Sequence, residues 1–585
     1  MSVVTPTRIG AVVCIASALW LSACTNDTQP VADTIYVGGD ILTMNDAQPR
    51  AEAVAVRGGL ILAVGSEADV MKTRGPDTTV IDLATHTLMP GFIDAHSHFF
   101  ITGLKLATVN LDPPPAGDVE SIDDIVHKLR TALSGRPLDQ DRWLIGWGYD
   151  NAMLADGRHP TRDDLDTIST EVPILVQHFS GHMAVVNSRG LALGGIDVDS
   201  IAPEGGVIQR RPDGREPNGI LEETAMLPVQ REALSQLMGG DDPELARAQA
   251  FERMSRTQEL YASRGYTTIT ELAARPEQVA LMRAAGQMGL LKLDLLAAVL
   301  YLTSTAEVTA ELYSESYTNH FRVAGGKVNL DGGSPGRTAF LREPYYKQKP
   351  GESDYRGYSS IERQADINDL VASYYALDVP IFIHALGDAA VDQSIEAVTH
   401  AETLYPGTDR RTQIIHLQQV QEDQFDRLQA LDVSLTFQVT HNFYFADFHA
   451  QEIYGPERTA RLNPAATALT RGLSVTIHHD SPVHPVDPFM LMWNVVARES
   501  RSGKVWGPEQ RISMMDALRA STLAAAYQFH EDHRKGSIEV GKLADFVILD
   551  SNPLTVAKDD IRKLRVLETI KEGRTVYALG IPGPA

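Results

Sequence analysis

Two histidines separated by a single residue follow an apolar run near residue 90. His96 and His98 close the stretch Leu-Met-Pro-Gly-Phe-Ile-Asp-Ala-His-Ser-His at residues 88–98. If this run is a buried strand, both imidazoles point the same way, because alternate side chains on a strand share a face. Two neutral imidazoles on one face form half of a metal site and need further ligands from elsewhere. Taken alone, the pair is more typical of two ordinary histidines at the end of a strand.

Three later apolar runs also end in side chains that can bind a metal. They end at His384, at His416 and, after His478 and His479, at Asp480. In a (β/α)₈ barrel the carboxyl ends of different strands converge on one mouth, and the catalytic groups come from those ends. The four runs therefore predict a single site in which imidazoles and a carboxylate meet.

The segments that would position these side chains alternate between β-branched apolar runs and helical patterns. This alternation is typical of repeated βα units and a parallel sheet. At 585 residues the chain is long enough for a (β/α)₈ barrel and a second domain. We expect an α/β fold with barrel strands near residues 88–94, 266–271, 293–299, 327–330, 381–384, 413–416, 433–437 and 474–478. We expect helices over residues 242–264, 361–376, 421–431 and 513–528.

Both ends of the chain contain short strand-like segments. We predict that residues 34–87 and 535–585 form one small composite β-sandwich, and that residues 88–534 form the barrel. Two further strand-like segments, 143–147 and 174–178, either belong to the barrel or mark an inserted subdomain within about residues 112–260.

The N-terminus has the pattern of an export signal. Residues 9–20 form an apolar core that is too short for a stable membrane anchor, and the following Leu-Ser-Ala-Cys resembles a bacterial lipobox. We predict a lipoprotein signal peptide over residues 1–23, acylation of Cys24 and a tether over residues 24–33. The alternative is a plain secretory peptide. By the same resemblance, Thr25 favours the outer membrane, because inner-membrane retention usually places Asp after the cysteine.

Cysteine and charge content exclude several classes of site and partner. Cys14 and Cys24 are the only cysteines, so the mature protein would contain no free thiol for catalysis, disulfide formation or metal binding. The formal net charge of −24 and the lack of a Lys/Arg cluster argue against a nucleic-acid partner. We expect a small-molecule substrate and a lipid-anchored, exported protein. A homo-oligomer is compatible with the sequence.

Motifs spread along the chain match one known family. They are Pro-Gly-Phe-Ile-Asp-Ala-His-Ser-His at 90–98, Gly-His-Met-Ala-Val-Val-Asn-Ser at 181–188, Asn-Gly-Ile-Leu-Glu-Glu at 218–223, Asp-Gly-Gly at 331–333, His-Ala-Leu-Gly-Asp at 384–388, Gly-Pro-Glu-Arg at 455–458, Asp-Ser-Pro-Val at 480–483 and the segment 536–545. With these motifs the sequence resembles the amidohydrolase superfamily, specifically its amidohydrolase-3 branch of YtcJ-like and N-substituted formamide deformylase-like proteins. The motifs are specific for the family and say little about the substrate.

The resemblance implies a distorted (β/α)₈ barrel with a composite β-sandwich and a centre of one or two divalent metal ions, with zinc expected first. It implies His96 and His98 as ligands from the first strand, His384 and His416 from the fifth and sixth strands, and Asp480 as the acid of the eighth strand.

Lys327 matches the lysine that some members of the family carboxylate to bridge two metal ions. An uncarboxylated ammonium group would repel the ion, so two ions are expected only if Lys327 is carboxylated. The other interpretation of Lys327 is an ordinary salt-bridging residue of a strand.

This ligand set predicts hydrolysis by activated water. A divalent ion with an open position lowers the pKa of a bound water from ~15.7 towards ~7 and polarises a substrate carbonyl. Asp480 would carry the proton from that water to the leaving group; the competing role is to orient a histidine. We predict a metal-dependent hydrolase of non-peptide C–N bonds in an amide, formamide, cyclic amide or carbamate. The alternatives are an esterase or lactonase, a metal-assisted isomerase or decarboxylase, and a non-catalytic surface-binding lipoprotein.

Several further residues are weaker candidates. His182, and with less support His178, would hydrogen-bond the developing oxyanion or a substrate group, or would be core or loop histidines. Asp94 and Asp388 are expected to orient a ligand or close a turn, and Glu271 either joins the site or forms a buried salt bridge. A hydrophobic pocket or ordinary packing would explain Trp147, Phe179, Tyr301, Phe443 and Tyr444.

The remaining histidines fall into two groups. His478 and His479 stand where many relatives carry Gly-Ser, and His441 lies at the end of the seventh strand; these would bind substrate, replace a ligand or shift the pKa of Asp480. Many others lie in helical or loop contexts and are predicted to be surface residues, for example His127, His400, His449, His530 and His533.

Overall fold

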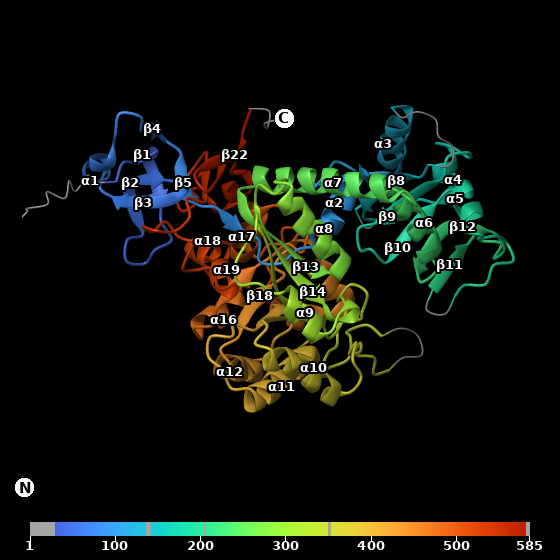
Figure 1. Ribbon diagram of the computed structural model, residues 1–585. Helices are drawn as coiled ribbons and strands as arrows, with labels where there is room; N and C mark the ends of the chain where they lie inside the picture. Colours follow the sequence, from blue (N-terminus) through green and yellow to red (C-terminus); the bar gives the residue numbers. More distant parts are fainter. Residues whose placement is uncertain (1–29, 136–141, 152, 204–205, 349–352, 581–585) are drawn as a thin grey trace, which may run out of the picture.

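The computed structural model of the protein describes residues 30–135, 142–151, 153–203, 206–348 and 353–580 (Figure 1). The predicted signal peptide, with Cys14 and Cys24, and the first part of the predicted tether lie outside the described residues. Within the described ranges, every helix is too short or too polar to cross a bilayer.

An eight-stranded parallel sheet forms the centre of the molecule. Its order is β19-β18-β17-β16-β15-β14-β13-β6. Each of the eight predicted strands overlaps one of its members, because continuous apolar runs are buried on both faces of a parallel sheet. The strands are β6 (Phe92–Ile93), β13 (Tyr266–Ala274), β14 (Asp294–Leu300), β15 (Phe321–Asn329), β16 (Ile381–Ala385), β17 (Gln413–His416), β18 (Ser434–Phe437) and β19 (Val475–Ile477).

Helices follow the strands and pack against the outside of this sheet (Figure 1). Three predicted helices are present with similar bounds as α7, α10 and α12. The helices of this region are α2 (Phe99–Leu106), α7 (Pro243–Ser263), α8 (Pro276–Gln287), α9 (Ala306–Leu312), α10 (Gln364–Ala376), α11 (Asp388–Leu404), α12 (Glu422–Ala430), α13 (His441–Tyr444), α14 (Ala446–Phe448), α15 (Gly455–Ala460), α16 (Ala465–Thr470), α17 (Pro488–Ala497), α18 (Met514–Ala520) and α19 (Leu523–Gln528).

The prediction of one helix over residues 513–528 is wrong, because the chain breaks between α18 and α19. Thr522 leaves the helical conformation with φ −134° and ψ −91°. The carbonyl of Ser521 accepts a 2.9 Å hydrogen bond from the backbone N–H of Ile93 in β6. A long-range bond to a strand therefore replaces the next intrahelical bond.

The sheet curls so that its first and last strands approach at their carboxyl ends. The backbone N–H of His98, after β6, donates a 2.9 Å hydrogen bond to the carbonyl of Ser481, after β19. In the described part of the chain, β6 and β19 are the two edges of the sheet and do not pair with each other. This contact brings the two ends of the sheet together where the predicted ligands lie.

A second eight-stranded sheet contains strands from both ends of the chain. Its order is β22-β21-β20-β5-β1-β2-β3, with β4 paired to β1. The ladder is continuous, so the predicted two-sheet sandwich is not confirmed. The strands are β1 (Thr34–Leu42), β2 (Arg50–Arg57), β3 (Leu60–Gly65), β4 (Thr79–Asp82), β5 (Thr87–Pro90), β20 (Phe546–Leu549), β21 (Val566–Lys571) and β22 (Arg574–Ala578); α1 (Glu67–Val70) follows β3.

The predicted strand at 88–94 is divided between these two sheets at Gly91. Residues before it pair with β20, and residues after it pair with β13. A Cβ at Gly91 would lie 2.3 Å from Cγ2 and 2.6 Å from Oγ1 of Thr267. Only a residue without a side chain therefore fits where the chain passes from one sheet to the other.

A third sheet, of six strands, occupies residues 109–223 (Figure 1). The strand-like segments at 143–147 and 174–178 belong to it and not to the central sheet. Two apolar cores of its own lie on its faces. Its elements are β7 (Val109–Asn110), α3 (Ile122–Ser134), β8 (Leu144–Tyr149), α4 (Arg162–Asp166), β9 (Ile174–His178), β10 (Met183–Val186), α5 (Ser188–Leu193), β11 (Gly206–Arg210) and β12 (Pro217–Glu223), with α6 (Leu227–Leu237) following.

Candidate metal centre

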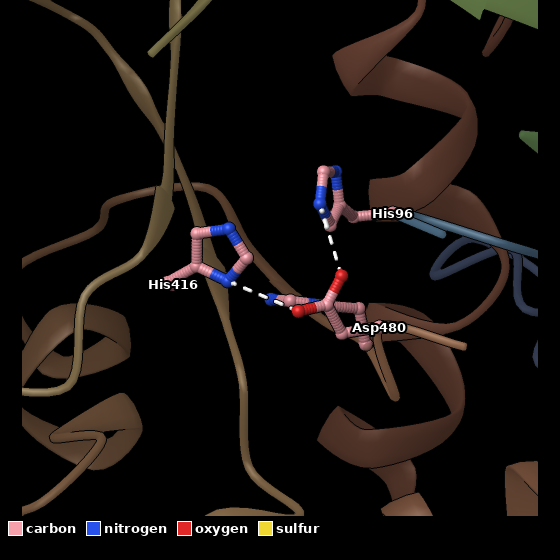
Figure 2. Close-up of side chains that lie close together, drawn as sticks. His96, His416 and Asp480 are labelled. Carbon is pink, nitrogen blue, oxygen red and sulfur yellow. Dashed lines mark ion pairs between the residues drawn. The ribbon is translucent and has the colours of Figure 1, made fainter. Parts of the chain in front are cut away.

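Four buried side chains meet at the carboxyl ends of the central strands. One ligand atom from each of His96, His416, His478 and Asp480 lies within 4.8 Å of the others. Nε2 of His96 is 3.3 Å from Oδ1 of Asp480, and Nδ1 of His416 is 3.8 Å from Oδ2. Figure 2 shows His96 and His416 directed at the two oxygens of this carboxylate.

Strand geometry explains why these residues meet. His96 follows β6, His416 ends β17, and His478 and Asp480 follow β19, so all four leave parallel strands in the same direction. The backbone is left-handed at His416 (φ 81°) and at Asp480 (φ 59°). Such conformations are costly for residues other than glycine and tend to cluster at functional sites.

The side chains of the centre lack the hydrogen bonds that burial normally requires. Both ring nitrogens of His96 and of His478, Nδ1 of His416 and Oδ1 of Asp480 are enclosed without a hydrogen-bond partner among the described residues. Buried polar atoms of native proteins are almost always partnered, and leaving one unpaired costs about 1–3 kcal/mol. A divalent cation would satisfy these nitrogens and the oxygen together, so the donor set fits a metal ion.

Electrostatics keep the four groups in the forms that bind a cation. Burial lowers the pKa of His96, His416 and His478, to about 3 for His478, so the imidazoles are neutral. Burial raises the pKa of Asp480, but the adjacent rings of His416, His96 and His98 outweigh this and hold it well below its usual range. The result is three neutral nitrogen donors around one carboxylate.

Two further predicted ligands lie beside this group. Nε2 of His98 is 3.3 Å from Oδ1 of Asp480, and its Nδ1 is 3.8 Å from Oε1 of Glu271. The ring of His384 lies 4.2 Å from that of His416, and its Nε2 is 3.4 Å from Oδ1 of Asp331. His98 and His384 therefore border the centre, but their ligand atoms are not part of the four-residue group.

Lys327 is enclosed next to these histidines. It is 1% exposed, and its Nζ has no hydrogen-bond partner and no ion pair among the described residues. Burial lowers the pKa of Lys327 to about 7, although the charge of Asp480 opposes this. The geometry does not match the salt-bridging interpretation; it leaves an amine that is partly neutral at neutral pH.

The structure does not bring His182 to the four-residue group. Its side chain is 47% exposed, and its Nδ1 lies 3.1 Å from Oε2 of Glu223 in the six-stranded sheet. His178 is buried in the same sheet, where its Nδ1 is 2.8 Å from Oγ of Ser180.

The predicted acidic residues orient neighbours or close turns. Oδ1 of Asp94 is 3.7 Å from Nε2 of His479, and Asp94 also accepts a hydrogen bond from the side chain of Thr270. Asp388 begins α11 and accepts a bond from the backbone of Arg342. These contacts keep Asp94 and Asp388 outside the four-residue group.

Sequence reasoning missed the position of two histidines. His478 was given three alternative roles, to bind substrate, replace a ligand or shift the pKa of Asp480, and was not predicted as a member of the ligand set. The structure groups it with His96 and Asp480, and its spacing of two residues from Asp480 at a strand end is the signal that could have identified it. The prediction that His449 is a surface residue is wrong, because it is fully buried and its Nε2 lies 3.2 Å from Nδ1 of His441. A loop context in the sequence does not reveal that the tertiary structure buries the side chain of His449.

The predicted pocket aromatics are spread over several regions. The Phe179 ring stacks on Phe445 with centroids 5.4 Å apart, and the Arg501 guanidinium lies 4.6 Å from the centroid of Tyr444. Phe179 and Tyr444 also line a small cavity of about 30 Å³ between the six-stranded sheet and the mouth of the central sheet. The structure places Trp147 in the six-stranded sheet and Tyr301 after β14.

Comparisons with known proteins agree with this geometry. The model of the Amidohydrolase family matches residues 79–577. The chain is 25% identical over 553 residues to N-substituted formamide deformylase of Arthrobacter pascens, covering 93% of this chain and 98% of the relative. It is 28% identical over 566 residues to Protein LONG AFTER FAR-RED 3 of Arabidopsis thaliana, covering 94% and 92%.

Solved structures share the fold. An uncharacterized metal-dependent hydrolase from Pyrococcus horikoshii superposes with a TM-score of 0.69 at 23% identity, covering 90% of this chain and 99% of that one. An adenosine deaminase from Xanthomonas campestris with bound zinc superposes with a TM-score of 0.51 at 14% identity, covering 94% and 95%.

Proposed function

This chain belongs to the amidohydrolase family and is a hydrolase of carbon–nitrogen bonds, and within that class we propose that it cleaves a non-peptide amide, formamide, cyclic amide or carbamate. The observation that carries the proposal is the buried group of His96, His416, His478 and Asp480, in which most ligand atoms have no hydrogen bond to the described part of the chain. The similarity to a formamide deformylase supports the choice of a non-peptide bond.

We propose that the four-residue group holds one divalent ion, and that His98, His384 and a carboxylated Lys327 complete a second position. A bound ion supplies water of lowered pKa and polarises the scissile carbonyl. Zinc is the first ion to test, because the adenosine deaminase with the same fold contains it. The neutral rings of His96, His416 and His478 bind the cation without having to release protons first.

Asp480 is placed to move the proton during hydrolysis. Its Oδ2 accepts a 2.8 Å hydrogen bond from Nε2 of Gln438, whereas Oδ1 has no hydrogen bond. The carboxylate of Asp480 would accept a proton from the attacking water and return it to the leaving nitrogen, which departs as an amine. General acid–base catalysis of this kind contributes about 10²–10⁴-fold to the rate.

The test combines metal exchange with an unbiased substrate panel. We expect a chelator to abolish turnover of at least one amide, formamide, cyclic amide or carbamate, and zinc to restore it, with products read by mass spectrometry. Turnover that survives complete metal removal would overturn the metal-dependent mechanism. Hydrolysis confined to esters and lactones would overturn the choice of bond, and no metal and no turnover would favour a binding module.

Two variants sharpen this test. Asp480→Asn should lower kcat by about 10²–10⁴-fold while circular dichroism and the melting temperature show a folded protein. The matched control is His320→Gln. His320 lies with Asp294 and Glu572 in a second group of side chains that are able to bind a metal ion. In that group the ammonium of Lys571 lies within 3.2 Å of both acids and already neutralises them. This control should keep the metal content and kcat of the wild type.

A further inference from the structure

A chain of two amide side chains connects Asp480 to His441. Gln438 donates from Nε2 to Oδ2 of Asp480 at 2.8 Å, and Nε2 of Gln418 is 3.3 Å from Oε1 of Gln438. Nε2 of Gln418 also lies 2.8 Å from Nδ1 of His441. All four residues are buried, so water does not compete for these bonds.

The negative charge of Asp480 determines which group donates in each hydrogen bond between these four side chains. A carboxylate only accepts hydrogen bonds, so the nitrogen of Gln438 must face it and the oxygen of Gln438 must face Gln418. Gln418 then presents its nitrogen, which can only donate. On the other side, the hydroxyls of Ser334 and Tyr454 both lie against Oε1 of Gln418 and can donate to it, which is compatible with the same orientation.

This orientation determines which nitrogen of His441 carries the proton. Nδ1 must accept the hydrogen bond from the Gln418 amide, so the proton of the neutral ring is on Nε2. Burial keeps the pKa of His441 well below its usual value, in agreement with a neutral ring. Nε2 of His441 has no hydrogen-bond partner within the described ranges, so this N–H remains available.

His441 stands at the mouth beside the metal centre. It begins α13 just after β18, the strand between β17 with His416 and β19, which leads into His478. Only the side chains of Gln438 and Gln418 separate its ring from the carboxylate of Asp480. By contrast, His182, the histidine that sequence analysis considered for the oxyanion, is exposed and paired with Glu223.

We propose that the Nε2–H of His441 is the hydrogen-bond donor to the substrate carbonyl oxygen, with its tautomer set by the relay from Asp480 through Gln438 and Gln418. This inference rests on the proposed function, because it assigns the group that stabilises the oxygen as negative charge develops during attack. His441 keeps its proton throughout. A preorganised neutral donor of this kind is worth about 10²–10³-fold in kcat.

The tautomer is tested without turnover. In protein with ¹⁵N-labelled histidine and zinc, long-range proton–nitrogen correlation should show a protonated Nε2 and an unprotonated Nδ1 for His441, assigned by their loss in His441→Gln. Gln418→Leu removes the amide that sets the tautomer and should give a mixture of both forms. A wild-type ring protonated at Nδ1 would overturn the relay.

The donor role is tested with acetohydroxamate, a small metal-chelating amide analogue, as the probe. Calorimetry on the zinc-loaded protein should show binding about tenfold weaker in His441→Ala, and partly recovered in His441→Gln, whose amide N–H replaces Nε2–H. The matched control is His449→Leu, which removes a neighbour of Nδ1 but leaves Nε2–H in place; its affinity should stay within about twofold of the wild type.

Kinetics separate the failure of this inference from the failure of the proposed function. With a turned-over amide, His441→Ala should lower kcat by about 10²–10³-fold and change KM little. Unchanged hydroxamate affinity and unchanged kcat in His441→Ala would refute the donor role while leaving the amidohydrolase function intact. If no substrate is hydrolysed but the hydroxamate affinity depends on His441, the proposed reaction fails and the assigned donor stands.

Discussion

Lys571 of the terminal sheet lies 2.9 Å from Asp294 of the central sheet, and both side chains are about 2% exposed. Lys535 approaches the same carboxylate at 2.5 Å. Burial alone would raise the pKa of Asp294, but the two lysines outweigh it and hold this pKa well below its usual value. One buried carboxylate is therefore paired with two ammonium groups, and the pair with Lys571 joins the two sheets.

This pairing predicts how stability depends on pH. A lowered folded-state pKa contributes stability above the unfolded value of about 3.9, and that contribution is lost as pH falls towards the folded value. We expect the free energy of unfolding, measured with urea, to decrease below about pH 5. Asp294→Asn removes one of the carboxylates that each buried lysine contacts, while Lys535 keeps Glu531 and Lys571 keeps Asp545. It should cost about 1–3 kcal/mol at pH 7, with a smaller loss of stability on acidification.

The control for this experiment is Asp378→Asn. Asp378 pairs with Arg410 at 3.0 Å, but its side chain is 92% exposed. Exposed pairs are worth little, so this variant should stay within about 0.5 kcal/mol of the wild type at both pH values. A pH dependence in Asp294→Asn as steep as in the wild type would show that other carboxylates cause the acid sensitivity.

His478 is predicted to bind the metal, although the resemblance to the family does not assign it as a ligand. We expect His478→Ala to lower metal affinity by at least about tenfold and to reduce the bound zinc measured by mass spectrometry of the native protein. His320→Gln should retain the wild-type stoichiometry. Full zinc occupancy of His478→Ala at limiting metal would place His478 outside the coordination sphere.

Lys327 is predicted to carry a carbamate. Its pKa of about 7 leaves a substantial fraction as the neutral amine, the form that reacts with carbon dioxide. Protein loaded in ¹³C-bicarbonate should show a carbamate carbon signal by NMR and two metal ions per chain. Lys327→Met should lose both the signal and one ion; a wild-type protein with one ion and no carbamate signal contradicts the prediction.

Gly91 is predicted to tolerate no side chain. Because a Cβ would lie 2.3 Å from Cγ2 of Thr267, Gly91→Ala should destabilise the protein by about 1–3 kcal/mol in urea denaturation. Thr267→Ala removes both Oγ1 and Cγ2, so the double variant Gly91→Ala with Thr267→Ala should recover part of the loss. Strict additivity of the two single variants would mean that the strain arises elsewhere.

Cys24 lies outside the described residues, and we propose that it is acylated and anchors the protein to the outer membrane. Expressed in a bacterial host with its full N-terminus, the protein should fractionate with membranes and incorporate labelled palmitate. Cys24→Ser should lose the label and leave the membrane fraction. Equal labelling of both proteins, or a soluble wild type, counts against the lipid anchor.

Local pattern was sufficient to predict much of this protein. The eight strands of the central sheet were predictable because each is a short segment rich in apolar and β-branched residues, a property of a few adjacent residues. The positions of His96, His416 and Asp480 at the carboxyl ends of such runs followed from the same pattern. Family resemblance, and not periodicity, supplied the roles assigned to these residues.

Long-range contacts determined the rest. The division of a single apolar run at Gly91 depends on Thr267, and the break between α18 and α19 depends on a hydrogen bond from β6. The inclusion of His478 in the centre, the burial of His449 and the exposure of His182 depend on how segments far apart in the sequence pack together. The sequence by itself determined the strands and the histidines at their ends. Only the tertiary structure decided which imidazoles meet, because the free energy of a side chain at the mouth depends on partners hundreds of residues away.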